Sequence, residues 1–249
     1  MAPKLFILIP PSEGKAAGGS KEHQEGTFDE VLAVPRQKVL KALKEALRSS
    51  SPKELEKILG VRGPLLERAV EATSELVRGK AGLLPAYQRY SGVVWTHLDP
   101  ATLSKSQRKH ILIPSGVYGI TTGQDLIGDY RLKMDVSLKD VGNVAKFWKP
   151  YLSQELAEFV KKSTVVNLLP SEHAKAVDFA YLETVAEVVN IEFTTADGSG
   201  AAGHDAKAVK GVVGRLVLTQ GLEALADFSW NGWHSLRSSQ SWKITAPKK

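Results

Sequence analysis

The sequence predicts a mixed α/β fold in which a central mixed sheet is flanked by helices. Apolar runs typical of strands alternate with segments of helical spacing along the 249 residues. Hydrophobic residues make up 43% of the chain and charged residues 24%, which is ordinary for a globular protein with a sizeable core. Because no long linker or break in composition occurs, we expect a single domain over 1–249, with residues 35–80 as a small helical subdomain.

The N-terminal region predicts a strand, a loop and a helix in turn. The apolar run at 5–9 is typical of a buried strand, and the Gly-, Lys- and Ser-rich segment 14–26 is typical of a surface loop. Residues 35–49 repeat apolar positions at helical spacing and predict an amphipathic helix.

Two further helices are expected to form a hairpin after it. Ser51 can cap the first, Pro52 suits its first turn, and Glu54 sits three residues after the cap. The segment 64–78 then carries a third helix behind the short connection "LGVRG".

The rest of the chain continues the alternation of strands and helices. We expect strands at 110–113, 164–169 and 188–195, and a terminal strand within 238–249. We expect helices after Pro150, over 174–181 and within 208–221, a Gly-rich loop at 114–130, and a turn at 196–205.

Composition limits the possible functions. The absence of cysteine excludes disulfides, iron–sulfur clusters, thiolate zinc sites and a cysteine nucleophile. The histidines lack metal-ligand spacing, so we expect no metal site and no cofactor. The short apolar run at the N-terminus does not predict a signal peptide or a membrane span, so a cytoplasmic protein is expected. The net charge of +6 permits an anionic partner, and nothing indicates the oligomeric state.

One turn recurs three times in the sequence. "ILIPPSE" at 7–13, "ILIPSG" at 111–116 and "NLLPSE" at 167–172 each place Pro-Ser after an apolar run. Because proline cannot continue a central ladder, we expect each strand to end there. If the strands are parallel, their carboxyl ends meet at one edge of the sheet, where ligands of open α/β sheets bind. The alternative is that each serine only caps a following helix.

The first turn matches neither of two common catalytic motifs. A Walker loop requires a glycine where Ile9 stands and a Ser or Thr where Ala16 stands. None of Ser12, Ser115 and Ser171 sits in a G-x-S-x-G elbow, so a serine hydrolase is not predicted.

The longer motifs resemble the YaaA family, the bacterial peroxide stress proteins. "ILIPPSEGK", "PSGVYGITTGQDLIGDYRLKM", "FW", "VVNLLPSEHAKAV" and "KGVVGR" occur in the order typical of that family. The resemblance implies a cytoplasmic protein that protects against peroxide and limits free iron. It also implies DNA binding through a helix-hairpin-helix-like element on an unusual mixed α/β fold. Glu13 departs from the family pattern of the first turn. The residues that match the family motifs are Tyr118, Gly119, Asp125, Leu126, Tyr130, Arg131, Leu132, Met134, Asn167, Leu168, Glu172, Lys175, Val177, Lys210, Gly211 and Arg215.

The first functional hypothesis is a DNA-binding stress protein that contacts the DNA backbone without sequence preference. Glycine at a helix N-terminus can expose backbone N–H groups to a phosphate. The alternative is a plain αα-hairpin in which Gly60 only ends a helix. The residues expected to contact DNA are Lys57, Gly60, Arg62, Gly63 and Arg68.

The second hypothesis is an enzyme with a pocket for a nucleotide or another phosphorylated small molecule. Carboxylates among the cations are of little use for holding DNA but suit cleavage or transfer at a glycosidic carbon. The alternative is that these groups form buried ion pairs, for example between Asp125 and Arg131. The expected catalytic residues are Glu13, Glu172, Tyr118 and Tyr130. The expected ligand-binding residues are Ser12, Lys15, Ser115, Asp125, Arg131, Asn167, Ser171, Lys175, Lys210 and Arg215.

Overall fold

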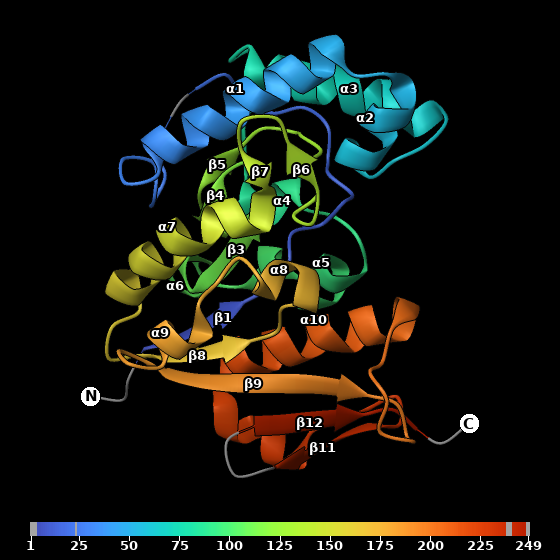
Figure 1. Ribbon diagram of the computed structural model, residues 1–249. Coiled ribbons are helices and arrows are strands. Elements are labelled where there is room, and N and C mark those ends of the chain that lie inside the picture. Colours follow the sequence, from blue (N-terminus) through green and yellow to red (C-terminus); the bar gives the residue numbers. More distant parts are fainter. Residues whose placement is uncertain (1–3, 23, 238–240, 248–249) are drawn as a thin grey trace.

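An eight-stranded mixed sheet forms the centre of the computed structural model, which describes residues 4–22, 24–237 and 241–247 (Figure 1). The strand order is β10-β11-β12-β9-β8-β1-β3-β4. The strands are β1 (Leu5–Leu8), β3 (Ile111–Ser115), β4 (Gly119–Thr122), β8 (Thr164–Asn167), β9 (Glu187–Thr194), β10 (Ser229–Trp230), β11 (Trp233–Arg237) and β12 (Ser241–Thr245). Small two-stranded pairs join β2 (Leu84–Pro85) to β5 (Leu126–Ile127) and β6 (Ser137–Leu138) to β7 (Gly142–Asn143).

The middle of the sheet is parallel, which meets the condition for the repeated turns to share one edge. β1 pairs in parallel with β8 on one side and with β3 on the other. Phe6 and Leu8 pack into the core on one face, and Ile7 and Ile9 pack into the core on the other. The carboxyl ends of β1, β3 and β8 therefore lie at the same edge, and both faces of β1 are covered.

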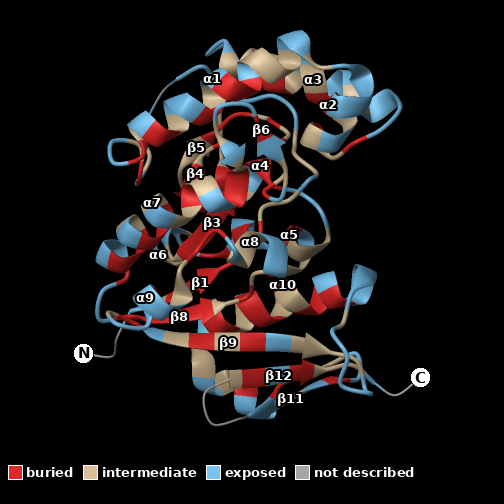
Figure 2. Cartoon of the chain, viewed as in Figure 1, coloured by how far each residue is buried: buried red, intermediate tan, exposed pale blue. Residues whose placement is uncertain are grey.

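Helices cover both faces of this sheet, which confirms the predicted fold class. The core on one face includes residues of α1 (Ala33–Ser49) and α7 (Val144–Phe159). The core on the other face includes residues of α5 (Val93–Leu98) and α10 (Gly203–Gln220). Figure 2 shows the buried residues concentrated in the central strands and along one side of each long helix. Short helices complete the fold: α4 (Ala86–Arg89), α6 (Lys105–Lys109), α8 (Ser171–Ala174), α9 (Phe179–Leu182) and 3₁₀ turns at Pro100–Thr102 and Leu222–Asp227.

α5 and α10 approach each other closely because α10 has a glycine at the contact. A Cβ added at Gly211 would lie 2.3 Å from the carbonyl oxygen of Val94 in α5. No side chain larger than hydrogen fits there without moving one helix.

The expected helical hairpin is present as α2 (Pro52–Leu59) and α3 (Pro64–Val77). The hydroxyl of Ser51 accepts from the N–H of Glu54, and the Glu54 carboxylate accepts from the N–H of Ser51. Gly60 ends α2 in the left-handed conformation at φ 67°. α1, α2 and α3 lie together at one end of the molecule, away from β11 and β12 (Figure 1).

Proline does not stop every strand, contrary to the expectation. Pro114 lies inside β3 and pairs with Ile120 of β4. The β1–β3 pairing ends at Leu112, so Pro114 lies where β3 pairs only with β4. The segment expected as a loop at 114–130 therefore contains β4 and β5.

Two helices begin earlier than expected. α7 begins at Val144 and contains Pro150, because Asn143 caps it by accepting from the N–H of Lys146. α10 begins at Gly203, within the segment expected as a turn. The terminal strand is present at β12, and residues 238–240 and 248–249 of its expected range lie outside the described residues. Across the described ranges, no helix combines the length and apolar character needed to cross a bilayer.

Candidate functional site

A cavity of about 520 Å³ opens at the edge where β1 and β8 end. The turn after β1 forms one wall with Pro10–Lys15, and the start of α8 contributes Pro170, Glu172 and His173. The first half of α10, the beginning of α5 and the segment 130–134 close the other sides. Its volume lies within the roughly 300–1,000 Å³ typical of small-molecule sites.

Seven residues selected from the sequence line this one cavity. Their positions in the chain run from 12 to 210, so only the folded sheet brings them together. They are Ser12, Glu13, Lys15, Tyr130, Arg131, Glu172 and Lys210.

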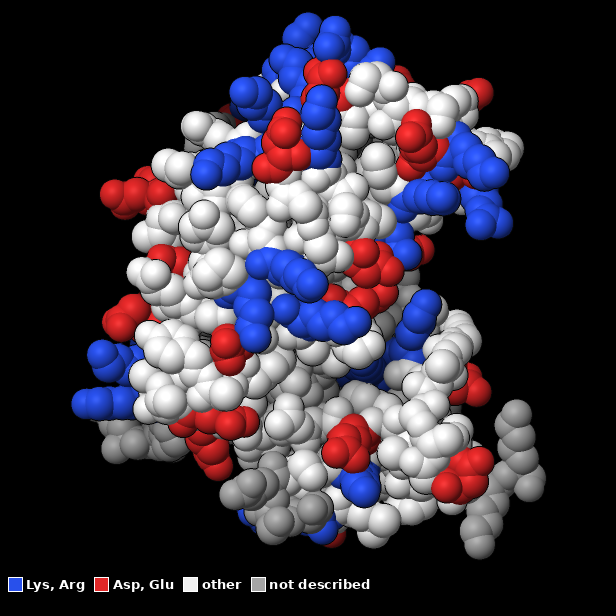
Figure 3. Space-filling model, viewed as in Figure 1, with Lys and Arg blue, Asp and Glu red and all other residues white. Residues whose placement is uncertain are grey.

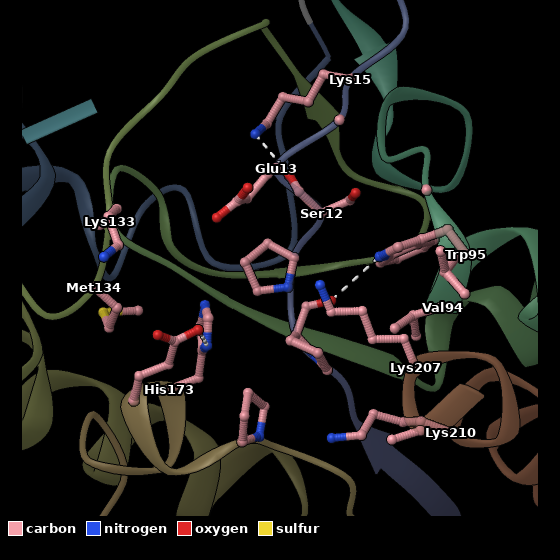
Figure 4. Close-up of a pocket in the computed structure, with 18 of the residues that line it drawn as sticks. Ser12, Glu13, Lys15, Val94, Trp95, Lys133, Met134, His173, Lys207 and Lys210 are labelled. Atoms are coloured by element: carbon pink, nitrogen blue, oxygen red, sulfur yellow. Dashed lines mark hydrogen bonds and ion pairs between the residues drawn. The ribbon is translucent and has the colours of Figure 1, made fainter. Parts of the chain in front are cut away.

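Glu13 and Arg131 form an ion pair at the mouth of the cavity. Their closest charged atoms are 3.7 Å apart, and the Glu13 side chain is 77% exposed whereas that of Arg131 is 20% exposed. Figure 4 shows the Glu13 carboxylate directed toward the centre of the cavity, with the Lys133 amine on the same side. An exposed ion pair at this distance is weak, so Glu13 remains accessible to a ligand.

Lys15 is packed against aromatic rings. Its Nζ lies 4.2 Å from the centroid of the Tyr130 ring and 5.4 Å from that of Tyr90, and it donates to the carbonyl of Ser12 at 2.9 Å. Burial, together with the charge of Arg131, lowers the pKa of Lys15 from 10.5 to about 7. At neutral pH this amine is therefore present in both its charged and its neutral form.

Tyr130 forms a wall beneath Lys15 and does not direct a free hydroxyl to the cavity. Its hydroxyl hydrogen-bonds with those of Tyr90 at 2.8 Å and Ser115 at 2.7 Å. Burial raises the pKa of Tyr130 to about 12, so the phenol is neutral at physiological pH.

Glu172 and Lys210 lie at the opposite end, on α8 and α10. Burial lowers the pKa of Lys210 to about 8, and the negative charge of Glu172 opposes this shift. Glu172 has an oxygen 3.4 Å from Nδ1 of His173, and this contact lowers the pKa of Glu172. In Figure 4 the amines of Lys207 and Lys210 extend into the cavity from the wall across from Ser12 and Glu13.

An apolar wall completes the cavity. Val94 and Trp95 of α5 and Phe193 of β9 line the cavity, and Met134 lies across from Val94 and Trp95, beside Lys133 (Figure 4). The Trp95 indole N–H donates to the Pro10 carbonyl at 3.2 Å, which fixes the ring against the first turn. A flat apolar group can thus pack beside the charged groups.

The other seven selected residues lie outside the cavity. Ser115 and Tyr118 bond internally, the former to Tyr130 and the latter by accepting from the N–H of Gly128. Asp125 accepts from Thr27 and from the N–H of Thr122, so the ion pair considered for it with Arg131 is replaced by these bonds. The side chain of Asn167 hydrogen-bonds to that of Asn190. Arg215 donates to the carbonyls of Leu98 and Asp99. Ser171 is exposed at the start of α8, and Lys175 is exposed just after its end.

The hairpin residues selected for DNA contact lie in three different surroundings. Lys57, Arg62 and Gly63 are exposed. The N–H of Gly60 donates to Glu56 in the helix end, and the Gly60 backbone packs on the side chain of Lys133. Arg68 turns toward the first loop, where it donates to the Lys15 carbonyl and lies 3.8 Å from Asp129.

Several cavity residues were not selected from the sequence. Lys207 lies three positions before Lys210 on the same helix, a spacing that places both on one face. Lys133 belongs to the long motif that already supplied Arg131, and Met134 was named only as a match to that family motif. Trp95 and Phe193 carried no signal beyond apolar character. Figure 3 shows Lys and Arg side chains beside acidic ones around the hollow on the right-hand side of the molecule.

These features define a mixed α/β protein with a cation-rich, ligand-sized cavity at the carboxyl edge of its sheet. The chain belongs to the YaaA family, because the family model described as peroxide stress protein YaaA matches residues 5–238. A UPF0246 protein of Streptomyces coelicolor is 29% identical over 241 residues, covering 91% of each chain. A UPF0246 protein of Francisella tularensis subsp. novicida is 26% identical over 236 residues, covering 90% of each chain. The resemblance stated from the motifs is confirmed, and membership supports a role related to peroxide stress.

Proposed function

We propose that the protein is an enzyme that binds a nucleotide-sized phosphorylated molecule in the cavity and cleaves or transfers a group at a glycosidic carbon. The observation that carries this proposal is the mixed charge of one concave site. Two carboxylates, Glu13 and Glu172, line the same cavity as five Lys and Arg side chains. A surface that only holds a polyanion gains nothing from carboxylates beside its cations.

The cation-rich end of the cavity suits a phosphate group. Lys207 and Lys210 extend from the first half of α10, and Gly203 at the start of that helix also lines the cavity. The positive end of the helix dipole adds to the attraction for an anion. The apolar wall formed by Trp95 and Phe193 accommodates a ring attached to that phosphate.

The carboxylates suit the chemistry of a glycosidic carbon, which gains positive charge as its bond breaks. The lowered pKa of Glu172 keeps this group ionised at neutral pH, so it stabilises a cationic carbon or acts as a base. Glu13 acts from the opposite wall, where it is free to approach a ligand.

Thermal unfolding with and without ligand tests the binding step. AMP, ADP and ribose 5-phosphate should raise the melting temperature, whereas adenosine and ribose should not. At a hundredfold excess over Kd the stabilisation is about 2.7 kcal/mol, which corresponds to roughly 5–10 °C for a chain of this size. Lys210→Met should reduce the shift, and Lys44→Met on the exposed side of α1 is the matched control.

A direct assay tests the chemical step. Release of a free base or a reducing sugar from the compound that binds best should fall at least about tenfold in Glu172→Gln. If phosphorylated and unphosphorylated compounds act alike on the melting temperature, the proposal is wrong.

Binding to the DNA backbone is a second candidate function, favoured by the exposure of three hairpin residues. Lys57, Arg62 and Gly63 are open to solvent on α2 and the turn that follows it. Exposed cations of this kind bind phosphates without reading sequence. Affinity for duplex DNA should then fall steeply with salt, and an affinity that is independent of salt would exclude this function.

A further inference from the structure

Lys15 lies between two cavities. It lines the large cavity and also a smaller one of about 190 Å³, whose lining includes Arg68 and Asp129. The backbone around it is fixed, because Lys15 forms a β-bridge with Tyr90 and the N–H of Ala16 donates to the Arg89 carbonyl. The amine is therefore held in one place and is accessible to a bound molecule.

Each carboxylate near Lys15 also lies beside an arginine, whose positive charge offsets part of its effect on the amine. Glu13 pairs with Arg131 at 3.7 Å, and Asp129 lies 3.8 Å from Arg68. The Lys15 amine instead faces aromatic rings and the Ser12 carbonyl. Burial away from water and the nearby charge of Arg131 favour the neutral amine, which is the form that attacks carbon. Together they lower the pKa of Lys15 to about 7.

We propose that Lys15 is a nucleophile that forms an imine with a carbonyl group of the molecule held in the cavity. The lone pair of Nζ adds to the carbonyl carbon, and the carbonyl oxygen takes one proton from the amine. The resulting carbinolamine loses its hydroxyl group with the second amine proton as water, which leaves a C=N bond. The sequence of steps consumes no oxidant or reductant. Figure 4 places Glu13 at the same end of the cavity as Lys15, where its carboxylate can carry the proton.

This inference rests on the proposed function and narrows its substrate class. The substrate is a phosphorylated molecule that carries an aldehyde or ketone, or a sugar whose ring opens when its glycosidic bond breaks. Its phosphate binds at Lys207 and Lys210, and its carbonyl carbon reaches the wall that carries Lys15. Lys210 keeps its proton more readily than Lys15 because Glu172 faces it, so the two amines have separate roles.

Pyridoxal 5′-phosphate is a suitable probe because it joins an aldehyde, a flat ring and a phosphate. The protein is incubated with this compound at pH 7, reduced with borohydride, digested and mapped by mass spectrometry. We expect Lys15 to be modified at least about tenfold faster than exposed lysines such as Lys44, because only a small fraction of an ordinary lysine is neutral at this pH. Preferential modification of Lys210, or modification in proportion to exposure, would overturn the inference.

The pH profile of modification adds a second measurement. Modification of Lys15 should rise between pH 6 and 8 and level off, whereas that of exposed lysines continues to rise beyond pH 9. A Lys15 profile that matches the exposed lysines contradicts the inference. The charged and titratable groups around the amine, which shape this profile, are Glu13, Arg68, Arg89, Tyr90, Asp129, Tyr130 and Arg131.

Lys15→Arg keeps the positive charge but removes the nucleophile. This variant should lose modification at position 15. If AMP stabilises the wild type but Lys15 is not modified, the imine is excluded and the proposed binding function stands. If no phosphorylated compound stabilises the protein, the proposed function fails, and preferential modification of Lys15 still supports the reactive amine.

Discussion

Replacing Lys15 with methionine should remove a specific pH dependence of stability. Burial holds the pKa of this amine at about 7 in the folded chain, against 10.5 for an ordinary lysine. Below pH 7 both the folded and the unfolded chain carry the proton, so folding bears the full cost of burying the charge. Between pH 7 and 10.5 the unfolded chain binds more protons than the folded chain, so the free energy of unfolding rises with pH.

The size of the effect follows from the shift. Between pH 6 and pH 9 the free energy of unfolding should rise by about 3 kcal/mol through this group alone, since each of two pH units above 7 contributes about 1.4 kcal/mol. Partial exposure of the side chain reduces this to about 2 kcal/mol. Lys15→Met also loses the hydrogen bond to Ser12 and the contact with Tyr130. This loss changes the overall stability of the variant but contributes less to the pH dependence of its stability.

Urea unfolding of the wild type and Lys15→Met at pH 6, 7, 8 and 9 measures this difference. The stability of the variant relative to the wild type should be greatest at pH 6 and should decline as the pH rises. Lys210 titrates near pH 8 in both proteins and therefore cancels. Lys44→Met serves as the exposed control. A difference that stays constant from pH 6 to pH 9 would refute the account of Lys15 as a buried, perturbed amine.

Three further predictions concern other parts of the fold. Arg89 is fully buried and donates to the carbonyls of Ala16, Gly18, Gly82 and Ile127. Arg89→Met should therefore lower the free energy of unfolding in urea by about 3–5 kcal/mol. The control Arg48→Met, at an exposed position, should lower it by less than about 1 kcal/mol. Gly211→Ala should lower the free energy of unfolding by about 1–3 kcal/mol, because its methyl group meets the Val94 carbonyl. Gly200→Ala, where the added methyl group meets open space, should leave the stability nearly unchanged. Equal effects of the two changes would contradict the close approach of α5 and α10. If the hairpin binds DNA, the double change Lys57→Ala and Arg62→Ala should lower the slope of log affinity against log salt by about 2, measured by fluorescence anisotropy, and an unchanged slope excludes these contacts.

The sequence predicted local structure best where one short segment determines it. The hairpin is an example, because Ser51 and Glu54 cap α2 through bonds that depend only on their own spacing. Strands β1 and β8 could be predicted equally well, since each is a short apolar run followed by a turn. Their parallel pairing brought Glu13 and Glu172 to one cavity, as the repeated turn had indicated.

What the sequence could not supply is which strand end stays open. The turn at 111–116 looks like the other two, but β4 folds back on β3 and the Ser115 hydroxyl is enclosed with Tyr130. α7 was misplaced because proline in a sequence usually marks a boundary, whereas Pro150 lies inside the helix. The roles of Trp95 and Phe193 in the cavity depend on packing between distant segments, which no local pattern encodes.

The cavity also constrains when the protein can act. Its walls come from the first turn of the chain, from the middle segment at 130–134 and from α10, which begins at Gly203. Glu13 and Lys210 are thus separated by about 200 positions, and contacts of such long range form only when most of the chain is already in place. A ribosome-bound chain that lacks α10 has no complete site, so ligand binding is restricted to finished molecules. A ligand in the cavity therefore resists unfolding of the whole chain rather than the fraying of one segment.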